Sequence, residues 1–78
     1  EGEIVGAIAK GAFIRFGEQG FEGFLPARSM REWYELNEGG TALLGRDSGR
    51  ALRIGDPVAV IVDRVEAPRG RVDLVPGV

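Results

Sequence analysis

The chain has 78 residues, a net charge of −2, and neither Cys nor His. This length allows one domain with one small core, and the apolar share of 44% and charged share of 28% are those of a globular protein rather than a disordered tail. No apolar run approaches the roughly 18 residues of a membrane span. The absence of Cys excludes thiolate chemistry, and the absence of His removes the commonest general base and the commonest metal ligand.

The high content of turn-forming residues, 13 Gly and 4 Pro, predicts short strands and frequent turns. The first strand is expected from Glu3 to Lys10. Alternation places Val5, Ala7 and Ala9 on one face and Ile4, Gly6 and Ile8 on the other. Because glycine weakens a strand interior, Gly6 indicates a bend or a close backbone approach.

The second and third strands are expected over residues 12–16 and 21–25. In the second, alternation turns Ala12, Ile14 and Phe16 inward and leaves Phe13 and Arg15 outward. Gly23 interrupts the third strand, and Pro26, which lacks an amide donor, belongs at its end.

Residues 29–36 read as a helical turn, with Ser29 as the N-cap and Glu32 at the capping-box spacing. Met30, Trp33 and Tyr34 stand at i, i+3 and i+4, which predicts one apolar face. We therefore expect these three side chains to cap the bottom of a barrel. A second stacking platform for a ligand is the alternative that this helical spacing disfavours.

The second half of the chain predicts a hairpin from residues 41–44 and 50–54, then two strands. Val58, Val60 and Val62 alternate cleanly, and the next inward candidate, Val65, follows three residues later, which predicts a bulge near Asp63. A turn at residues 68–70 leads to the last strand, Arg71 to Val75, whose inward residues are Val72 and Leu74.

Together these elements predict an all-β fold. Five main strands, a short helical turn between the third and fourth, and a small extra hairpin match the five-stranded Greek-key OB-fold barrel.

The chain resembles the S1-type RNA-binding domain in an ordered set of segments. They are Ile4-Val5-Gly6-Ala7-Ile8, Gly11-Ala12-Phe13-Ile14, Glu22-Gly23-Phe24-Leu25-Pro26, Ile54-Gly55-Asp56-Pro57-Val58-Ala59-Val60-Ile61-Val62 and Gly70-Arg71-Val72-Asp73-Leu74. The stretch from Trp33 to Asp56, with Leu44-Gly45, Ser48-Gly49 and Ile54-Gly55-Asp56, is most similar to the C-terminal S1 domain of ribonuclease II and ribonuclease R exoribonucleases.

The resemblance implies a role in RNA degradation. Those enzymes are hydrolases that degrade RNA processively from the 3′ end with Mg²⁺, using carboxylates in a separate nuclease domain, and the S1 domain holds single-stranded RNA at the channel mouth. We therefore expect residues 1–78 to form a single S1-type domain of a larger, cytoplasmic chain that carries this nuclease domain. No cofactor is expected for the S1 domain itself, and no membrane contact.

Five residues are candidates for RNA contact: Phe13, Arg15, Lys10, Arg71 and Glu66. An exposed Phe13 can stack a base, although aromatic residues also pack under loops. Arg15 lies about 7 Å further along the same face, where it can meet a phosphate or remain a solvated charge. The resemblance implies the RNA-contact role of Lys10, Glu66 and Arg71.

Two family contact positions differ in this chain, because Lys10 replaces an aromatic residue and Pro26 replaces a histidine. Asp73 is expected to weaken the field of the neighbouring Arg71, and Glu66 and Arg71 can equally form a surface ion pair. These departures favour the alternative that the barrel serves mainly as a protein-contact or structural module. Catalysis by this chain is not expected, because no pair of carboxylates has a catalytic or metal-binding spacing.

Overall fold

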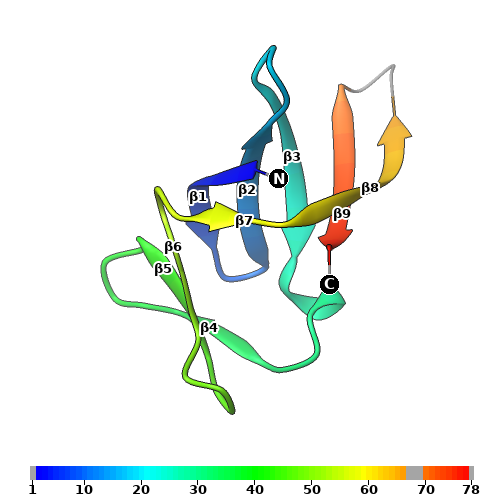
Figure 1. Cartoon of the computed structure of the whole chain (residues 1–78). Coiled ribbons are helices and arrows are strands. Elements are labelled where there is room, and N and C mark those ends of the chain that lie inside the picture. Colours follow the sequence, from blue (N-terminus) through cyan, green and yellow to red (C-terminus); the bar gives the residue numbers. More distant parts are fainter. Residues whose placement is uncertain (1, 67–69, 78) are drawn as a thin grey trace.

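A computed structural model describes residues 2–66 and 70–77. Within these ranges the chain forms short strands and one 3₁₀-helix, η1 (Figure 1). In chain order they are β1 (Gly2–Ile8), β2 (Gly11–Phe16), β3 (Phe21–Pro26), η1 (Ala27–Ser29), β4 (Tyr34–Leu36), β5 (Ala42–Gly45), β6 (Ala51–Arg53), β7 (Pro57–Val58), β8 (Val60–Glu66) and β9 (Arg71–Pro76).

The larger sheet has the order β7-β1-β2-β3-β9-β8, and all its neighbours are antiparallel except β3 and β9. β7 and β8 are one stretch of chain interrupted at Ala59, and this stretch pairs with β1 at one end and with β9 at the other. The sheet therefore curls on itself (Figure 1). Counted as one strand, β7–β8 completes the five strands of the predicted OB-fold.

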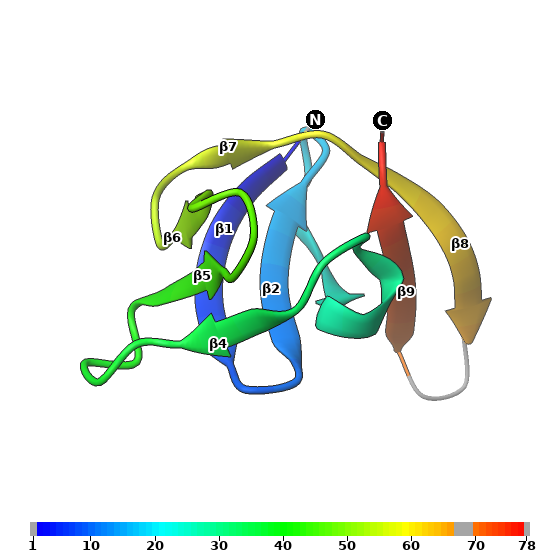
Figure 2. The same cartoon turned by 90° about the horizontal axis from the view of Figure 1, so that it is seen from below.

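The predicted extra hairpin is present as β5 and β6, and β4 adds a third strand to it. Figure 2 shows this small sheet lying across β1 and β2, on the inner side of the curl. Its side chains complete the core, which consists of Ile4, Ala12, Ile14, Leu25, Tyr34, Leu43, Leu52 and Leu74. The inward positions predicted on β2 and β9 are confirmed by the full burial of Ala12, Ile14 and Leu74.

The predicted helical turn is displaced. The helical residues are Ala27–Ser29, and the chain is extended by Tyr34. Ser29 is not an N-cap, because its hydroxyl donates to the Pro26 carbonyl at 2.6 Å. The capping box is also wrong, since the Glu32 carboxylate accepts from the amides of Asp47 and Ser48. Pairing of Tyr34 with Gly45 on β5 outweighs the weak helical preference of so short a segment.

Two bulges change which residues face the core. The β1–β2 register shifts between Ile4 and Gly6, so that Ile4 and Ala7 both pack inward and the expected separation of their faces is wrong. The predicted bulge near Asp63 is confirmed by a shift between Val62 and Arg64. Val65, however, is 61% exposed rather than buried, because it lies near the end of β8, an edge strand whose main packing partner is β9.

The predicted turn at residues 68–70 lies mostly outside the described residues. In the part of the chain that the structure does describe, no helix is long and apolar enough to cross a membrane.

Candidate nucleic-acid interface

The outer face of the large sheet carries a pair of aromatic rings at its centre. Phe13 on β2 and Phe24 on β3 are cross-strand partners, and their ring centroids lie 5.2 Å apart at an interplanar angle of 52°. Phe13 stays 38% exposed, as the alternation on β2 predicted. Its ring is therefore held by a neighbouring ring and still presents part of its surface to solvent, which suits a base-stacking platform.

Two glycines make room for these rings. Gly6 lies opposite Phe13 on β1, and a Cβ there would come within 3.3 Å of the Phe13 ring, which confirms the expected close approach. At Gly11 a Cβ would come within 2.8 Å of the Phe24 ring and would collide with the Leu25 carbonyl oxygen. The rings therefore lie directly on the backbone. A larger residue at Gly6 would require the Phe13 ring to shift slightly, and one at Gly11 would collide with its neighbours.

Arg15 is exposed two residues beyond Phe13 on the same face, as predicted. Its cross-strand partners are Glu3 on β1 and Glu22 on β3, so two carboxylates flank the guanidinium position. Opposite charges directly across strands attract each other, and the two acidic neighbours weaken the positive field that a phosphate would meet.

Arg71 and Glu66 are cross-strand partners on β9 and β8. The Nε atom of Arg71 donates to Oδ1 of Asp73 at 3.0 Å, so the two residues lie next to each other as predicted. Glu66 in turn lies 3.9 Å from Nε of Arg64. Both candidates thus belong to a mixed network of charges rather than to a basic patch.

Lys10 lies at the other end of the face, in the turn between β1 and β2, with its side chain exposed. Its carbonyl oxygen accepts from the amide of Ala27 at 2.8 Å, which ties the turn to η1. The structure therefore brings Phe13 and Arg15 together on β2. It places Arg71 two strands away on β9 and Glu66 three strands away on β8, and leaves Lys10 in the β1–β2 turn, three residues before Phe13.

The expectation that Trp33 packs at the barrel bottom is wrong, whereas its neighbour Tyr34 is buried as expected. Tyr34 is 7% exposed and belongs to the core, Met30 packs partly against it, and Trp33 is 67% exposed. The reason is the extended backbone, because successive residues of a strand point to opposite sides. Trp33 instead lines a hollow of about 710 Å³ together with Lys10 and Arg28.

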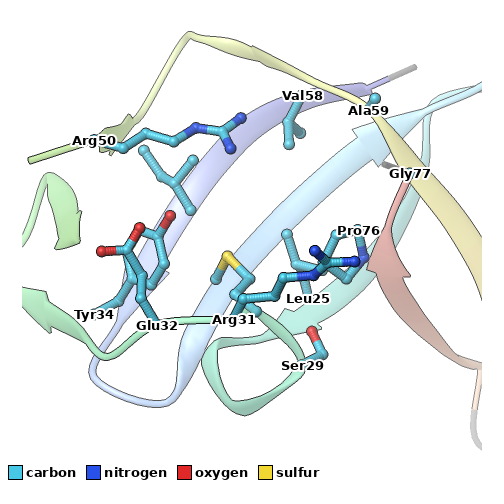
Figure 3. Close-up of a pocket in the computed structure, with 12 residues that line it drawn as sticks. Leu25, Ser29, Arg31, Glu32, Tyr34, Arg50, Val58, Ala59, Pro76 and Gly77 are labelled. Carbon is cyan, nitrogen blue, oxygen red and sulfur yellow. The ribbon is translucent and has the colours of Figure 1, made fainter. Parts of the chain in front are cut away.

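A second cavity of about 470 Å³ opens at the end of the barrel between β3, β6 and β9 (Figure 3). Its lining combines apolar residues such as Leu25 and Val58 with two arginines. In Figure 3 the Arg50 side chain extends toward Val58, while Arg31 reaches toward Pro76 from the opposite side.

Glu32 on the rim of this cavity organises the turn between β5 and β6. Its carboxylate accepts from the Ser48 hydroxyl at 2.5 Å and from the amides of Asp47 and Ser48, both at 2.9 Å. The hydrogen bonds from Ser48 hold the pKa of Glu32 below its ordinary value of 4.5. Burial of the neighbouring Tyr34, aided by the negative charge of Glu32, raises the pKa of its phenol above 10.0.

Sequence reasoning missed the supporting role of Phe24 and the exposure of Trp33. The alternation on β3, with Leu25 inward, was a signal that could have placed Phe24 beside Phe13. No local sequence pattern could have predicted the exposure of Trp33, because its orientation depends on the pairing of β4 with β5. Among residues 2–66 and 70–77 no cluster of three or more His, Cys, Asp or Glu side chains could hold a metal ion.

The family model of the S1 RNA binding domain matches residues 1–75 of the chain. Ribonuclease R of Thermotoga maritima is 29% identical over 73 residues, which cover 92% of this chain and 10% of that protein. The acetazolamide conferring resistance protein zam of Synechocystis is 34% identical over 74 residues, covering 94% of this chain and 10% of that protein. The chain thus spans about a tenth of the length of these relatives.

Solved structures of RNase R from Mycoplasma genitalium match with a TM-score of 0.85 at 21% identity. One is the apo form and the other is a complex with ribose methylated single-stranded RNA; the match covers 96% of this chain and 12% of each of those chains. At this identity the likeness establishes the fold. The predicted OB-fold and the resemblance to the S1 domain of ribonuclease R are both confirmed.

Proposed function

The chain belongs to the S1 RNA binding domain family, and from this premise we propose that it binds single-stranded RNA across the outer face of β2, β3 and β9. The observation that carries the proposal is the Phe13 ring, which is 38% exposed and supported at 5.2 Å by Phe24. Base stacking on such a ring contributes about 1–3 kcal/mol and tolerates any base. Lys10, Arg15 and Arg71 supply phosphate contacts around it, and Glu66 helps to orient Arg71.

This binding is weak when the chain acts alone. The net charge is −2, Arg15 lies between two glutamates, and Arg71 pairs with Asp73. We expect a dissociation constant on the order of 10 μM or higher. We also expect a shallow salt dependence, since each neutralised phosphate of a single strand contributes a slope of only about −0.7.

The larger function belongs to a parent chain. The matched relative from Thermotoga maritima is a ribonuclease R, and we propose that this domain is the C-terminal module of a processive 3′-to-5′ exoribonuclease in the cytoplasm. In that role it holds RNA at the entrance to a separate nuclease domain, where Mg²⁺ supports hydrolysis. The domain itself has no catalytic role in this proposal, so incubation with RNA and Mg²⁺ should leave the RNA intact.

Titration of the chain with a labelled oligoribonucleotide tests the proposed RNA binding. Phe13→Ala should weaken binding about fivefold or more, as expected for the loss of one stacking contact. Phe21→Ala is the matched control, because Phe21 is more exposed but packs against Phe16 rather than Phe24. Equal binding curves for the unmutated chain and Phe13→Ala, or no binding at millimolar RNA, would contradict the proposal.

A protein-contact module is the second candidate, favoured by the apolar surface of β8, where Ile61, Val62 and Val65 are all exposed. Exposed apolar patches commonly mark contacts with other proteins. This function predicts amide shift changes on β8 when the nuclease domain of the parent is added, and none when RNA is added.

A further inference from the structure

Trp33, the only tryptophan of the chain, is held in an exposed position by ordered backbone on both sides. Its carbonyl oxygen accepts from the Arg46 amide at 2.9 Å, and the next residue, Tyr34, is anchored in the core. The indole therefore does not protrude from a loose loop. An exposed aromatic side chain on a hydrogen-bonded backbone is a ready stacking surface for a planar ligand.

The indole borders the hollow of about 710 Å³, a volume within the range of ligand sites. Three parts of the fold form its walls: the turn between β1 and β2, η1 with the residues after it, and the turn between β5 and β6. These parts contribute Ala9 and Lys10, then Ala27, Arg28 and Met30, and finally Asp47. The hollow thus combines an aromatic ring, an apolar floor and exposed basic side chains.

Two exposed cations of the hollow can meet a phosphate-bearing ligand, beside two carboxylates, Glu32 and Asp47. Lys10 and Arg28 are both exposed, so they can meet phosphate groups. Glu32 also lines the hollow, where the Asp47 and Ser48 amides and the Ser48 hydroxyl orient its carboxylate without removing its negative charge. Arg31 lines both cavities, and in Figure 3 its side chain extends toward Pro76.

Lys10 connects the hollow to the Phe13 face. It is three residues before Phe13, about 10 Å along the chain, and it lines the hollow itself. A single strand lying over Phe13 can therefore pass Lys10 and enter the hollow within a few nucleotides. OB-folds bind roughly 4–16 nucleotides, which is enough to span both places.

We propose that Trp33 forms a second base-stacking subsite, in which Lys10 and Arg28 hold the phosphates of a single-stranded RNA that continues from Phe13. This inference rests on the proposed RNA binding and extends its path to the other side of the β1–β2 turn. The occupant is RNA rather than protein, because the aromatic ring, the two cations and the continuity with Phe13 occur together.

The lone tryptophan provides the test. We titrate the chain with an oligoribonucleotide of about ten nucleotides, recording tryptophan fluorescence and affinity together. Stacking should quench the emission of Trp33. Trp33→Leu should weaken binding about fivefold or more, whereas Trp33→Phe, which keeps a stacking ring, should retain most of the affinity. Lys10→Gln and Arg28→Gln should each reduce the salt slope by about 0.7, and Arg53→Gln, an exposed control on β6, should not.

The outcomes separate the two proposals. One outcome refutes the subsite and leaves the Phe13 interface in place. In it, Phe13→Ala weakens RNA binding, Trp33→Leu binds RNA as well as the unmutated chain does, and the Trp33 emission stays constant at saturating RNA. If the parent sequence binds no RNA, both proposals fail. If the emission of Trp33 responds to the nuclease domain of the parent and not to RNA, the hollow is a protein contact and the subsite is again refuted.

Discussion

Phe24 holds Phe13 from the neighbouring strand, with their ring centroids 5.2 Å apart. Because Phe24 is half-buried and Phe13 is exposed, the Phe24 ring supports the Phe13 ring, and the Phe13 ring is accessible to a ligand. The proposed stacking platform is therefore a pair of residues with separate roles, and this division leads to the first prediction.

Phe24→Leu should weaken RNA binding less than Phe13→Ala does. Tilted aromatic pairs contribute about 0.5–1.5 kcal/mol beyond their buried area, and the loss of this support loosens the Phe13 ring. In a double-mutant cycle by RNA titration, Phe24→Leu should have no further effect once Phe13 is alanine. Additive effects would instead mean that Phe24 contacts RNA itself.

Gly11→Ala should destabilise the fold by about 1–3 kcal/mol, because the added methyl group would collide with the Leu25 carbonyl and the Phe24 ring. Its φ of 157° adds strain for any other residue. Gly39→Ala is the control, since the nearest atom to its Cβ would be 3.8 Å away. Urea unfolding of both variants measures the difference, and equal stabilities would contradict this account of Gly11.

Leu43→Ala should cost about 2–5 kcal/mol, whereas Leu44→Ala on the same strand should cost less than about 1 kcal/mol. Leu43 is fully buried in the shared core and Leu44 is 44% exposed. Thermal or urea unfolding of the two variants tests whether the small sheet of β4, β5 and β6 is part of one core. Similar small losses for both would show that it folds onto the barrel without stabilising it.

Stability should fall as the pH drops below 4.5, the ordinary pKa of a glutamate, because of Glu32. Its pKa is lower in the folded chain, so its hydrogen bonds to Ser48 and Asp47 stabilise the fold above that pH and are lost as the carboxylate is protonated. Melting temperatures measured against pH should therefore decline less steeply for Glu32→Gln, which is already destabilised at neutral pH. A parallel decline in the two proteins would refute this role.

Asp73→Asn should tighten RNA binding by up to about fivefold, because the acceptor of the 3.0 Å hydrogen bond from Arg71 Nε loses its negative charge. Glu38→Gln makes the same change of net charge in the exposed loop between β4 and β5 and serves as the control. Filter binding at two salt concentrations distinguishes a specific effect on Arg71 from a general effect of net charge. An equal gain for both variants would assign the effect to net charge instead of Arg71.

Local patterns in the sequence determined the five main strands along the chain and the outward position of Phe13. The alternating directions of Ala12, Phe13 and Ile14 follow from the two-residue period of a strand, which is a local property and needs no information from the rest of the chain. The bulge near Asp63 could be predicted for the same reason, because the three-residue step from Val62 to Val65 breaks that period.

Only the tertiary structure decided the positions of Ala7 and Trp33. The register shift between Ile4 and Gly6, which turns Ala7 inward, depends on how β1 aligns with β2. The exposure of Trp33 depends on the pairing of Tyr34 with Gly45, eleven residues further along the chain. A short segment with helical spacing has too little intrinsic stability to hold that form, so a sheet partner distant in sequence determines its backbone. The same pairing buries Tyr34 and leaves the indole of Trp33 in solvent, where we propose its function.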